Sequence, residues 1–198
     1  AYRERQCPHE GAALLVLDCL SLEDWLLIGA TWRARHPEWH VEERLVLAQI
    51  PTVTEVSRLA LTSGLRPADL PPAGRAVNEA QQWAAFWARE GVPEGACAWA
   101  YLALERDGLP AEVESSRVRR LCLVDGKLDE MVHNSTLGAG ELQASLRLWL
   151  EGYGRRLEEV IALLLGRGLA VYLASDHGHV EARGMGQPSE GLLAQTRG

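Results

Sequence analysis

The chain has 198 residues, of which 47% are hydrophobic and 24% are charged, and its formal net charge is −7 at pH 7. This length suffices for one domain with a substantial core, and the composition excludes an intrinsically disordered chain. The acidic balance excludes a broad basic surface, so any contact with nucleic acid needs a local patch. No apolar run reaches the roughly 18 residues of a membrane span, and we expect no membrane partner.

The cysteines indicate the cellular compartment of the protein, and the chain ends indicate its domain organisation. Four widely spaced cysteines form no C-x-x-C motif, and the last three lie in apolar runs: Cys7, Cys19, Cys97 and Cys122. This pattern is typical of buried free thiols in a reducing compartment, so we expect a cytoplasmic protein. The first residue is Ala1, and the sequence ends in T-R-G. We therefore expect residues 1–198 to be a single domain cut from a longer chain.

Apolar runs and amphipathic stretches alternate in the first part of the chain. Residues 12–17 (A-A-L-L-V-L) predict a strand that is covered on both faces and ends at Asp18. Apolar residues at helical spacing then predict a helix from about 22 to about 35. Residues 44–50 (R-L-V-L-A-Q-I) predict the next strand.

The stretch P-T-V-T-E-V-S-R at 51–58 predicts a turn that enters a helix. Thr52 and Glu55 have the spacing of a capping box, which would place Thr54 in the first helical turn. A hydroxyl there faces exposed backbone N–H groups and the positive end of the helix dipole, a favourable place for a phosphate. The alternative is that both threonines only cap the helix.

The middle of the chain predicts a loop, a helix and two strands. Residues 63–75 are rich in Pro and Gly and predict a loop, and 78–90 predict a helix. Its apolar face carries three aromatic residues, which we expect in the core rather than as a base-stacking platform: Trp83, Phe86 and Trp87. Residues 96–104 and 119–124 predict strands, and the polar residues 105–116 between them predict a linker.

After the second of these strands, Asp129 and His133 are four positions apart. On one helical turn both side chains point to the same side and can bind one metal ion. The same spacing is also typical of a plain surface ion pair. Apolar residues at steps of three and four then predict a long helix over 142–164, bent at Gly152 and Gly154.

A buried strand predicted at 169–174 opens into the polar turn S-D-H-G-H, where we expect the functional site. Asp176, His177 and His179 offer carboxylate and imidazole groups, which suit zinc and similar divalent ions. A plain turn would show the same polar pattern, but open α/β sheets place their sites at such strand ends. The alternation of strands and helices predicts an α/β fold, with a largely parallel sheet sandwiched by helices.

Four motifs, in this order, resemble the PglZ domain of the alkaline phosphatase superfamily. They are V-L-D at 16–18, P-T-V-T-E-V-S-R at 51–58, L-D-E-M-V-H at 128–133 and S-D-H-G-H-V-E-A at 175–182. The resemblance runs from about residue 14 to the end, and S-D-H-G-H with the upstream P-T-x-T is its most specific part. It implies an alkaline phosphatase-like fold and a two-metal hydrolase site, with two zinc ions or with manganese.

The resemblance also implies roles for single residues. The ligands of the first metal ion would be Asp18, Thr54, Asp176 and His177, and those of the second would include Asp129 and His133. Thr54 would be the nucleophile, because metal coordination is one of the few ways to stabilise a threonine alkoxide. Arg58, one turn beyond Thr54, would reach the phosphoryl oxygens, unless it is a surface residue.

Two features differ from the family pattern. Relatives commonly supply a third histidine to the second metal from well downstream of S-D-H-G, and this chain has no histidine after His179. Either His179 fills that place or the ligand lies outside this sequence. In addition, Asp18 is followed by Cys19, where the family more often has glycine.

The function implied by the resemblance is a metal-dependent phosphoric-ester hydrolase of a bacterial anti-phage system of the BREX type. A phosphodiesterase or nuclease is favoured over a monoesterase, so the substrate would be a phosphate ester such as a nucleic acid or nucleotide. Other defence-system proteins would bind through regions outside this sequence. The alternative is a non-catalytic scaffold or signalling module with a vestigial or single-metal site, and a weaker alternative is a hydrolase of sulfate or phosphonate esters.

Overall fold

A fully parallel four-stranded sheet forms the centre of the fold in the computed structural model, which describes residues 11–70, 78–134 and 139–180. Its strands are β1 (Gly11–Leu17), β2 (Cys97–Leu102), β3 (Arg120–Asp125) and β4 (Leu169–Ala174). They lie in the order β2-β3-β1-β4, so β1 pairs with both β3 and β4. The predicted α/β fold with a parallel sheet is therefore confirmed.

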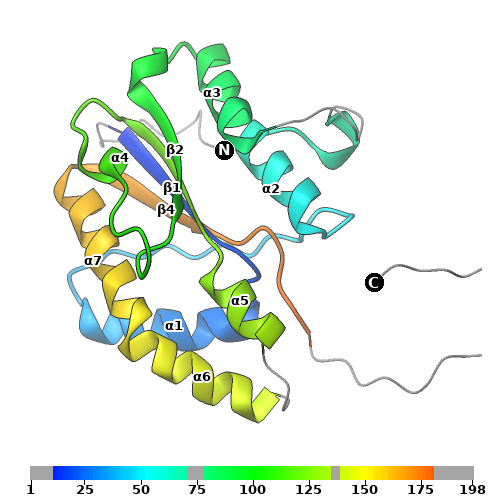
Figure 1. Cartoon of the computed structure of the whole chain (residues 1–198), viewed down its shortest axis with the longest axis vertical. Coiled ribbons are helices and arrows are strands. Elements are labelled where there is room, and N and C mark those ends of the chain that lie inside the picture. The colour runs from blue at the N-terminus through cyan, green and yellow to red at the C-terminus, as the bar shows by residue number, and fades with distance from the viewer. Residues whose placement is uncertain (1–10, 71–77, 135–138, 181–198) are drawn as a thin grey trace, which may run out of the picture.

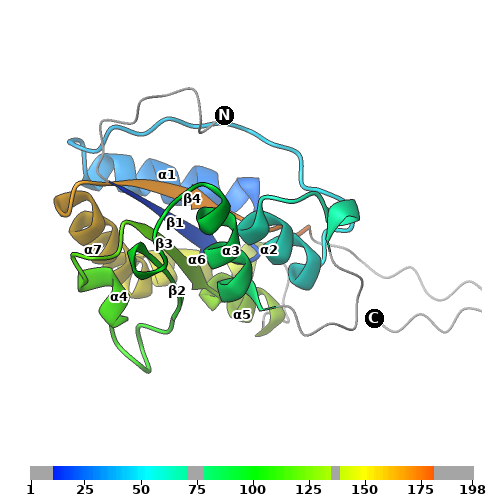
Figure 2. The ribbon, with the colours of Figure 1, turned by 90° about the horizontal axis from the view of Figure 1, so that it is seen from above.

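Helices cover both faces of this sheet (Figures 1 and 2). On one face lie α2 (Thr54–Ser63) and α3 (Glu79–Arg89), and on the other lie α1 (Leu22–Arg35), α6 (Ala139–Glu151) and α7 (Tyr153–Gly166). Two shorter helices, α4 (Ala111–Glu114) and α5 (Lys127–Asn134), flank β3 along the chain, and 3₁₀ turns occur at Pro67–Asp69 and Glu94–Ala96. No helix in the described ranges has the length and apolar character to cross a membrane.

The strand β1 supplies side chains to the core on both faces of the sheet. Leu15 and Leu17 are fully buried against the layer of α1, α6 and α7, whereas Val16 packs with Trp83 and Trp87 of α3. This alternation follows from the two-residue period of a strand. The continuous apolar run at 12–17 is thus explained, and the predicted core position of the α3 aromatics is confirmed.

The strand predicted at 44–50 is wrong. These residues lie outside the sheet, and the side chains of Leu45, Val46 and Leu47 are more than 80% exposed. A strand needs a hydrogen-bonded neighbour, and no strand of the described residues pairs with this segment. A composition that is typical of a strand was therefore not sufficient to predict one at 44–50.

Helix boundaries differ from the predictions at three places. The predicted capping box is wrong, because α2 begins at Thr54 and its N-cap, Val53, has no side-chain acceptor. The long helix over 142–164 is interrupted at Gly152, whose φ of −105° and ψ of −91° are not helical. The predicted linker at 105–116 contains the short helix α4.

The cysteines of the described ranges are free thiols. Cys19 and Cys122 are buried, as predicted, while Cys97 at the start of β2 is only half-buried. Cys7 lies outside the described residues. Burial raises the pKa of the Cys122 thiol, which therefore acts as an uncharged core residue.

A buried carboxylate at the end of β3 holds two helices in place. Asp125 is fully buried and accepts hydrogen bonds from the Tyr153 hydroxyl of α7 and from the Lys127 backbone N–H (3.0 Å) at the start of α5. Burial raises the pKa of Asp125 to about 6, against the opposing effect of these two bonds. The position of α5 therefore depends on a group that is costly to ionise inside the protein.

We expect Asp125 to make the fold less stable as the pH rises from about 4 to about 6. An unfolded Asp titrates near about 3.9, so the folded state binds more protons in this range and a higher pH favours unfolding. Denaturant unfolding of the wild type should show a loss of roughly 2–3 kcal/mol over this range that Asp125→Asn lacks. The same pH dependence in both proteins would contradict the raised pKa.

Candidate active site

The candidate site lies at the edge of the sheet where the parallel strands end. Asp18 follows β1 directly, and Asp176 lies two residues after β4. Because β1 and β4 are paired with Val16 opposite Ala174, both turns leave the sheet side by side. The sheet register thereby brings together two carboxylates that are far apart in sequence.

Asp18, Asp176 and His177 form a tight group, in which one potential ligand atom of each lies within 4.8 Å of the others. Both carboxylates are more than nine-tenths buried. Oδ1 of Asp18 and Oδ2 of Asp176 receive no hydrogen bond, and each lies 3.6 Å from Nε2 of His177. Buried carboxylate oxygens without a donor are costly, so this donor set fits a divalent cation.

The two carboxylates repel each other, and their surroundings only partly compensate for this. Burial and the negative charge of Asp176 raise the pKa of Asp18, while the Arg58 guanidinium acts in the opposite direction. The other oxygen of Asp176, Oδ1, accepts hydrogen bonds from the backbone N–H groups of Cys19 (3.2 Å) and His177 (2.9 Å). Asp176 is therefore fixed by the two turns that meet at this edge.

The Thr54 hydroxyl reaches this group from the first residue of α2. Its Oγ1 lies 2.7 Å from Nε2 of His177. The other ring nitrogen, Nδ1, lies 3.2 Å from the carbonyl oxygen of Gly178, which can only accept, so Nδ1 carries a hydrogen. In the neutral imidazole Nε2 then accepts the Thr54 hydrogen. The hydroxyl oxygen thus lies beside the atoms that suit a cation.

Arg58 is held between two carboxylates. Its Nη1 donates to Oδ2 of Asp18 (3.1 Å) and its Nε donates to Oε1 of Glu79 (2.9 Å). The guanidinium also lies 5.8 Å from the centre of the Tyr101 ring. The Arg58 side chain is only 16% exposed, so the geometry does not favour a plain surface role. Glu79 was not singled out in the sequence, because a glutamate in the first turn of a helix is common.

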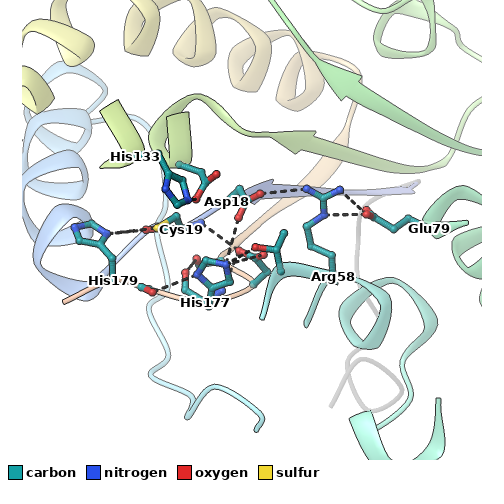
Figure 3. A network of polar contacts seen from close by, with 12 residues as sticks. Asp18, Cys19, Arg58, Glu79, His133, His177 and His179 are labelled. Carbon is teal, nitrogen blue, oxygen red and sulfur yellow. Dashed lines mark hydrogen bonds and ion pairs between the residues drawn. The ribbon is translucent and has the colours of Figure 1, made fainter. Parts of the chain in front are cut away.

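Two of the residues expected at a second metal position, His133 and His179, are drawn with Cys19 in Figure 3. On α5, Nε2 of His133 lies 3.4 Å from Oδ1 of Asp129. The His179 ring has Nδ1 3.0 Å from the Cys19 carbonyl oxygen and Nε2 3.6 Å from a carboxylate oxygen of Asp24. In the described part of the chain, these side chains do not form a group as tight as the first.

The Cys19 thiol is buried beside these side chains. Burial, followed by the nearby carboxylates of Asp129 and Asp18, raises the pKa of the Cys19 thiol to about 12. Cys19 also has a φ of +65°, in the left-handed region that favours glycine. The thiol is therefore carried by a backbone position at which a side chain is uncommon.

Comparison with known protein families identifies the family of this chain. None of the curated proteins matches the chain. A family model described as "BREX system PglZ alkaline phosphatase-like domain" matches residues 6–198, which is nearly the whole chain. The parallel sheet between two helical layers is consistent with that fold. The chain therefore belongs to the PglZ family, as a phosphatase-like domain associated with the BREX defence system.

Proposed function

We propose that this domain is a metal-dependent phosphoric-ester hydrolase with Thr54 as its nucleophile. The main support is the Thr54 hydroxyl, which lies 2.7 Å from His177 in a group whose two buried carboxylates each have an oxygen without a donor. Membership in an alkaline phosphatase-like family supports phosphoryl chemistry. We assign the activity to anti-phage defence for the same reason.

The first metal position would be held by Asp18, Asp176 and His177, with the Thr54 oxygen as a further ligand. When bound there, a divalent cation lowers the pKa of the hydroxyl and neutralises charge on the phosphoryl oxygens. This set contains only oxygen and imidazole donors, so both zinc and manganese are suitable. Asp129 and His133 are the proposed ligands of a second ion, with His179 as the third.

The proposed reaction is a double displacement at phosphorus. The Thr54 hydroxyl gives up its proton to solvent as its oxygen attacks phosphorus, the bond to the leaving alcohol breaks, and the alkoxide leaving group takes up a proton from solvent. Water then attacks the phosphothreonine ester, phosphate or its monoester is released, and the Thr54 oxygen regains a proton. Because Thr54 is the first residue of α2, a phosphoryl group on its oxygen would lie near the N–H groups of the helix N-terminus.

Arg58 would contribute to this reaction in two ways. In the structure it orients Asp18 through the bond between Nη1 and Oδ2. To bind a phosphoryl oxygen as well, the guanidinium would exchange one of its carboxylate partners for the substrate. Its planar fork of donors suits either partner.

We propose a phosphodiester, as in a nucleic acid or a cyclic or linear nucleotide, rather than a monoester. A monoester is close to a dianion at neutral pH, whereas a diester carries one negative charge. With the first position occupied alone, the site would offer one divalent cation and the Arg58 guanidinium, which already binds two carboxylates. The smaller charge of a diester matches this better.

Thr54→Ala should abolish hydrolysis, because it removes the attacking oxygen. With metal-loaded protein and bis(4-nitrophenyl) phosphate, we expect turnover to fall by about 10³-fold or more. Elemental analysis should show that most of the metal remains, since both carboxylates and His177 are unchanged. The exposed neighbour Thr52 provides the matched control, and Thr52→Ala should keep the wild-type rate. Unchanged turnover in Thr54→Ala would remove Thr54 from the nucleophile role.

Asp176→Asn should lose metal and activity together. The amide brings no negative charge to the position of Oδ2, the oxygen that receives no hydrogen bond. After metal loading and desalting, we expect metal content and diester hydrolysis to fall well below the wild-type values. Asp69→Asn is the control, because Asp69 forms a surface ion pair with Arg66. If Asp176→Asn kept both its metal and its activity, the first metal position would be wrongly assigned.

A further inference from the structure

An open pocket of about 400 Å³ lies at the same edge of the sheet, where β2 and β3 end. Its lining comes from the ends of both strands, from α5 and from the loop after β2, and includes Tyr101, Glu105, Gly126, Lys127 and Glu130. This volume is within the range of small-molecule sites, about 300–1,000 Å³. The pocket can therefore hold an organic group of a substrate.

The pocket adjoins the first metal position. The Asp18 backbone N–H donates to the Asp125 carbonyl oxygen (2.9 Å), and Asp125 is followed directly by Gly126 of the pocket. The Arg58 guanidinium, which binds Asp18, lies 5.8 Å from the centre of the Tyr101 ring. A group attached to a phosphate at the first position can therefore extend into this pocket.

Tyr101 is an aromatic residue that the core leaves partly uncovered. Trp99, two residues earlier on the same side of β2, packs with the aromatic core of α3, whereas Tyr101 is 45% exposed. A Cβ at position 126 would overlap the Tyr101 hydroxyl, so Gly126 allows this side chain to lie against the end of β3. An exposed aromatic ring in a pocket offers a surface on which a planar base can stack.

The lysine of the pocket is paired with two glutamates that also line it. Nζ of Lys127 lies 2.9 Å from Oε2 of Glu105 and 3.1 Å from Oε2 of Glu130. Arg106, which lines the pocket as well, pairs with Asp107 (3.1 Å). Paired charges favour an uncharged ring over a second phosphate. An ammonium group has three donors and each carboxylate has two acceptor oxygens, so donors and acceptors remain for the polar edge of a base.

We propose that this pocket binds a nucleobase of the phosphodiester substrate, with the base stacked on Tyr101. This inference rests on the phosphodiesterase function proposed above and deepens it to a diester that contains a nucleotide. The base takes no part in the reaction, so Tyr101 determines specificity and is not a catalytic residue. Because every base has a π face, stacking here should accept different bases.

Two phosphodiesters with the same leaving group test the proposal: thymidine 5′-(4-nitrophenyl phosphate), which carries a base, and methyl 4-nitrophenyl phosphate, which carries none. We expect the metal-loaded wild type to prefer the nucleotide ester in kcat/KM, and Tyr101→Ala to lower this preference by roughly tenfold, chiefly through KM. Tyr101→Phe keeps the ring and should keep the preference. Any displacement of Arg58 in Tyr101→Ala affects both esters and cancels in the ratio. The control Tyr172→Ala removes a tyrosine of similar exposure (44%) on β4 and should keep the wild-type ratio.

Equilibrium binding of thymidine 5′-monophosphate gives a readout that needs no turnover. Its Kd should rise by roughly tenfold in Tyr101→Ala and stay near the wild-type value in Tyr101→Phe and Tyr172→Ala. If the methyl ester is hydrolysed and Tyr101→Ala keeps the wild-type ester preference, the base subsite is overturned and the proposed function stands. A preference lost equally in Tyr101→Phe would also overturn stacking, because the ring is still present. If neither ester is hydrolysed, the proposed function fails and the Kd decides: weaker binding in Tyr101→Ala supports the subsite, and an unchanged Kd overturns it.

Discussion

Two buried carboxylates at the ends of neighbouring parallel strands are the constraint on which the site depends. The pairing of β1 with β4 places Asp18 and Asp176 together, and burial and the charge of Asp176 raise the pKa of Asp18. Such a pair is stable only when other groups offset its charge and desolvation. Arg58 of α2 does so through the hydrogen bond from its Nη1 to Oδ2 of Asp18. The placement of α2, and of Thr54 at its start, is therefore linked to the electrostatics of the sheet edge.

The formal charges of the side chains at this edge of the sheet do not cancel. The carboxylates of Asp18 and Glu79 accept hydrogen bonds from the Arg58 guanidinium, and a third carboxylate, that of Asp176, lies beside Asp18. The His177 ring fits the neutral form. With all three ionised, the group carries a formal charge of −3 + 1 = −2, and all four side chains are largely buried. A divalent cation would neutralise this excess, whereas in its absence a proton on the Asp18–Asp176 pair relieves part of it. The ion pairs therefore support the proposed cation, as the donor set does.

Local sequence patterns predicted most of the fold, and two of their failures share one physical cause. The helix at 22–35 and the strands at 12–17 and 169–174 are correct, because hydrophobic periodicity records which side of an element is buried. The strand at 44–50 failed, because pairing depends on a partner that composition does not specify. For the same reason the sequence did not predict that Glu79 would bind Arg58, since two helices must pack before these residues meet. The candidate ligands were found because strand ends and short motifs placed them.

The two proposed metal positions differ in how firmly the fold holds them. The first is built on adjacent strand ends, whereas the second takes Asp129 and His133 from the eight-residue helix α5, where the His133 side chain is 77% exposed. Ordering an exposed imidazole costs side-chain entropy, so the second position depends more on whatever else fixes α5. One buried group can do this: Asp125, which accepts hydrogen bonds from the start of α5 and from Tyr153 of α7. The second proposed position is therefore connected to the sheet edge only through Asp125 at the end of β3 among the contacts described above, whereas the first is part of that edge.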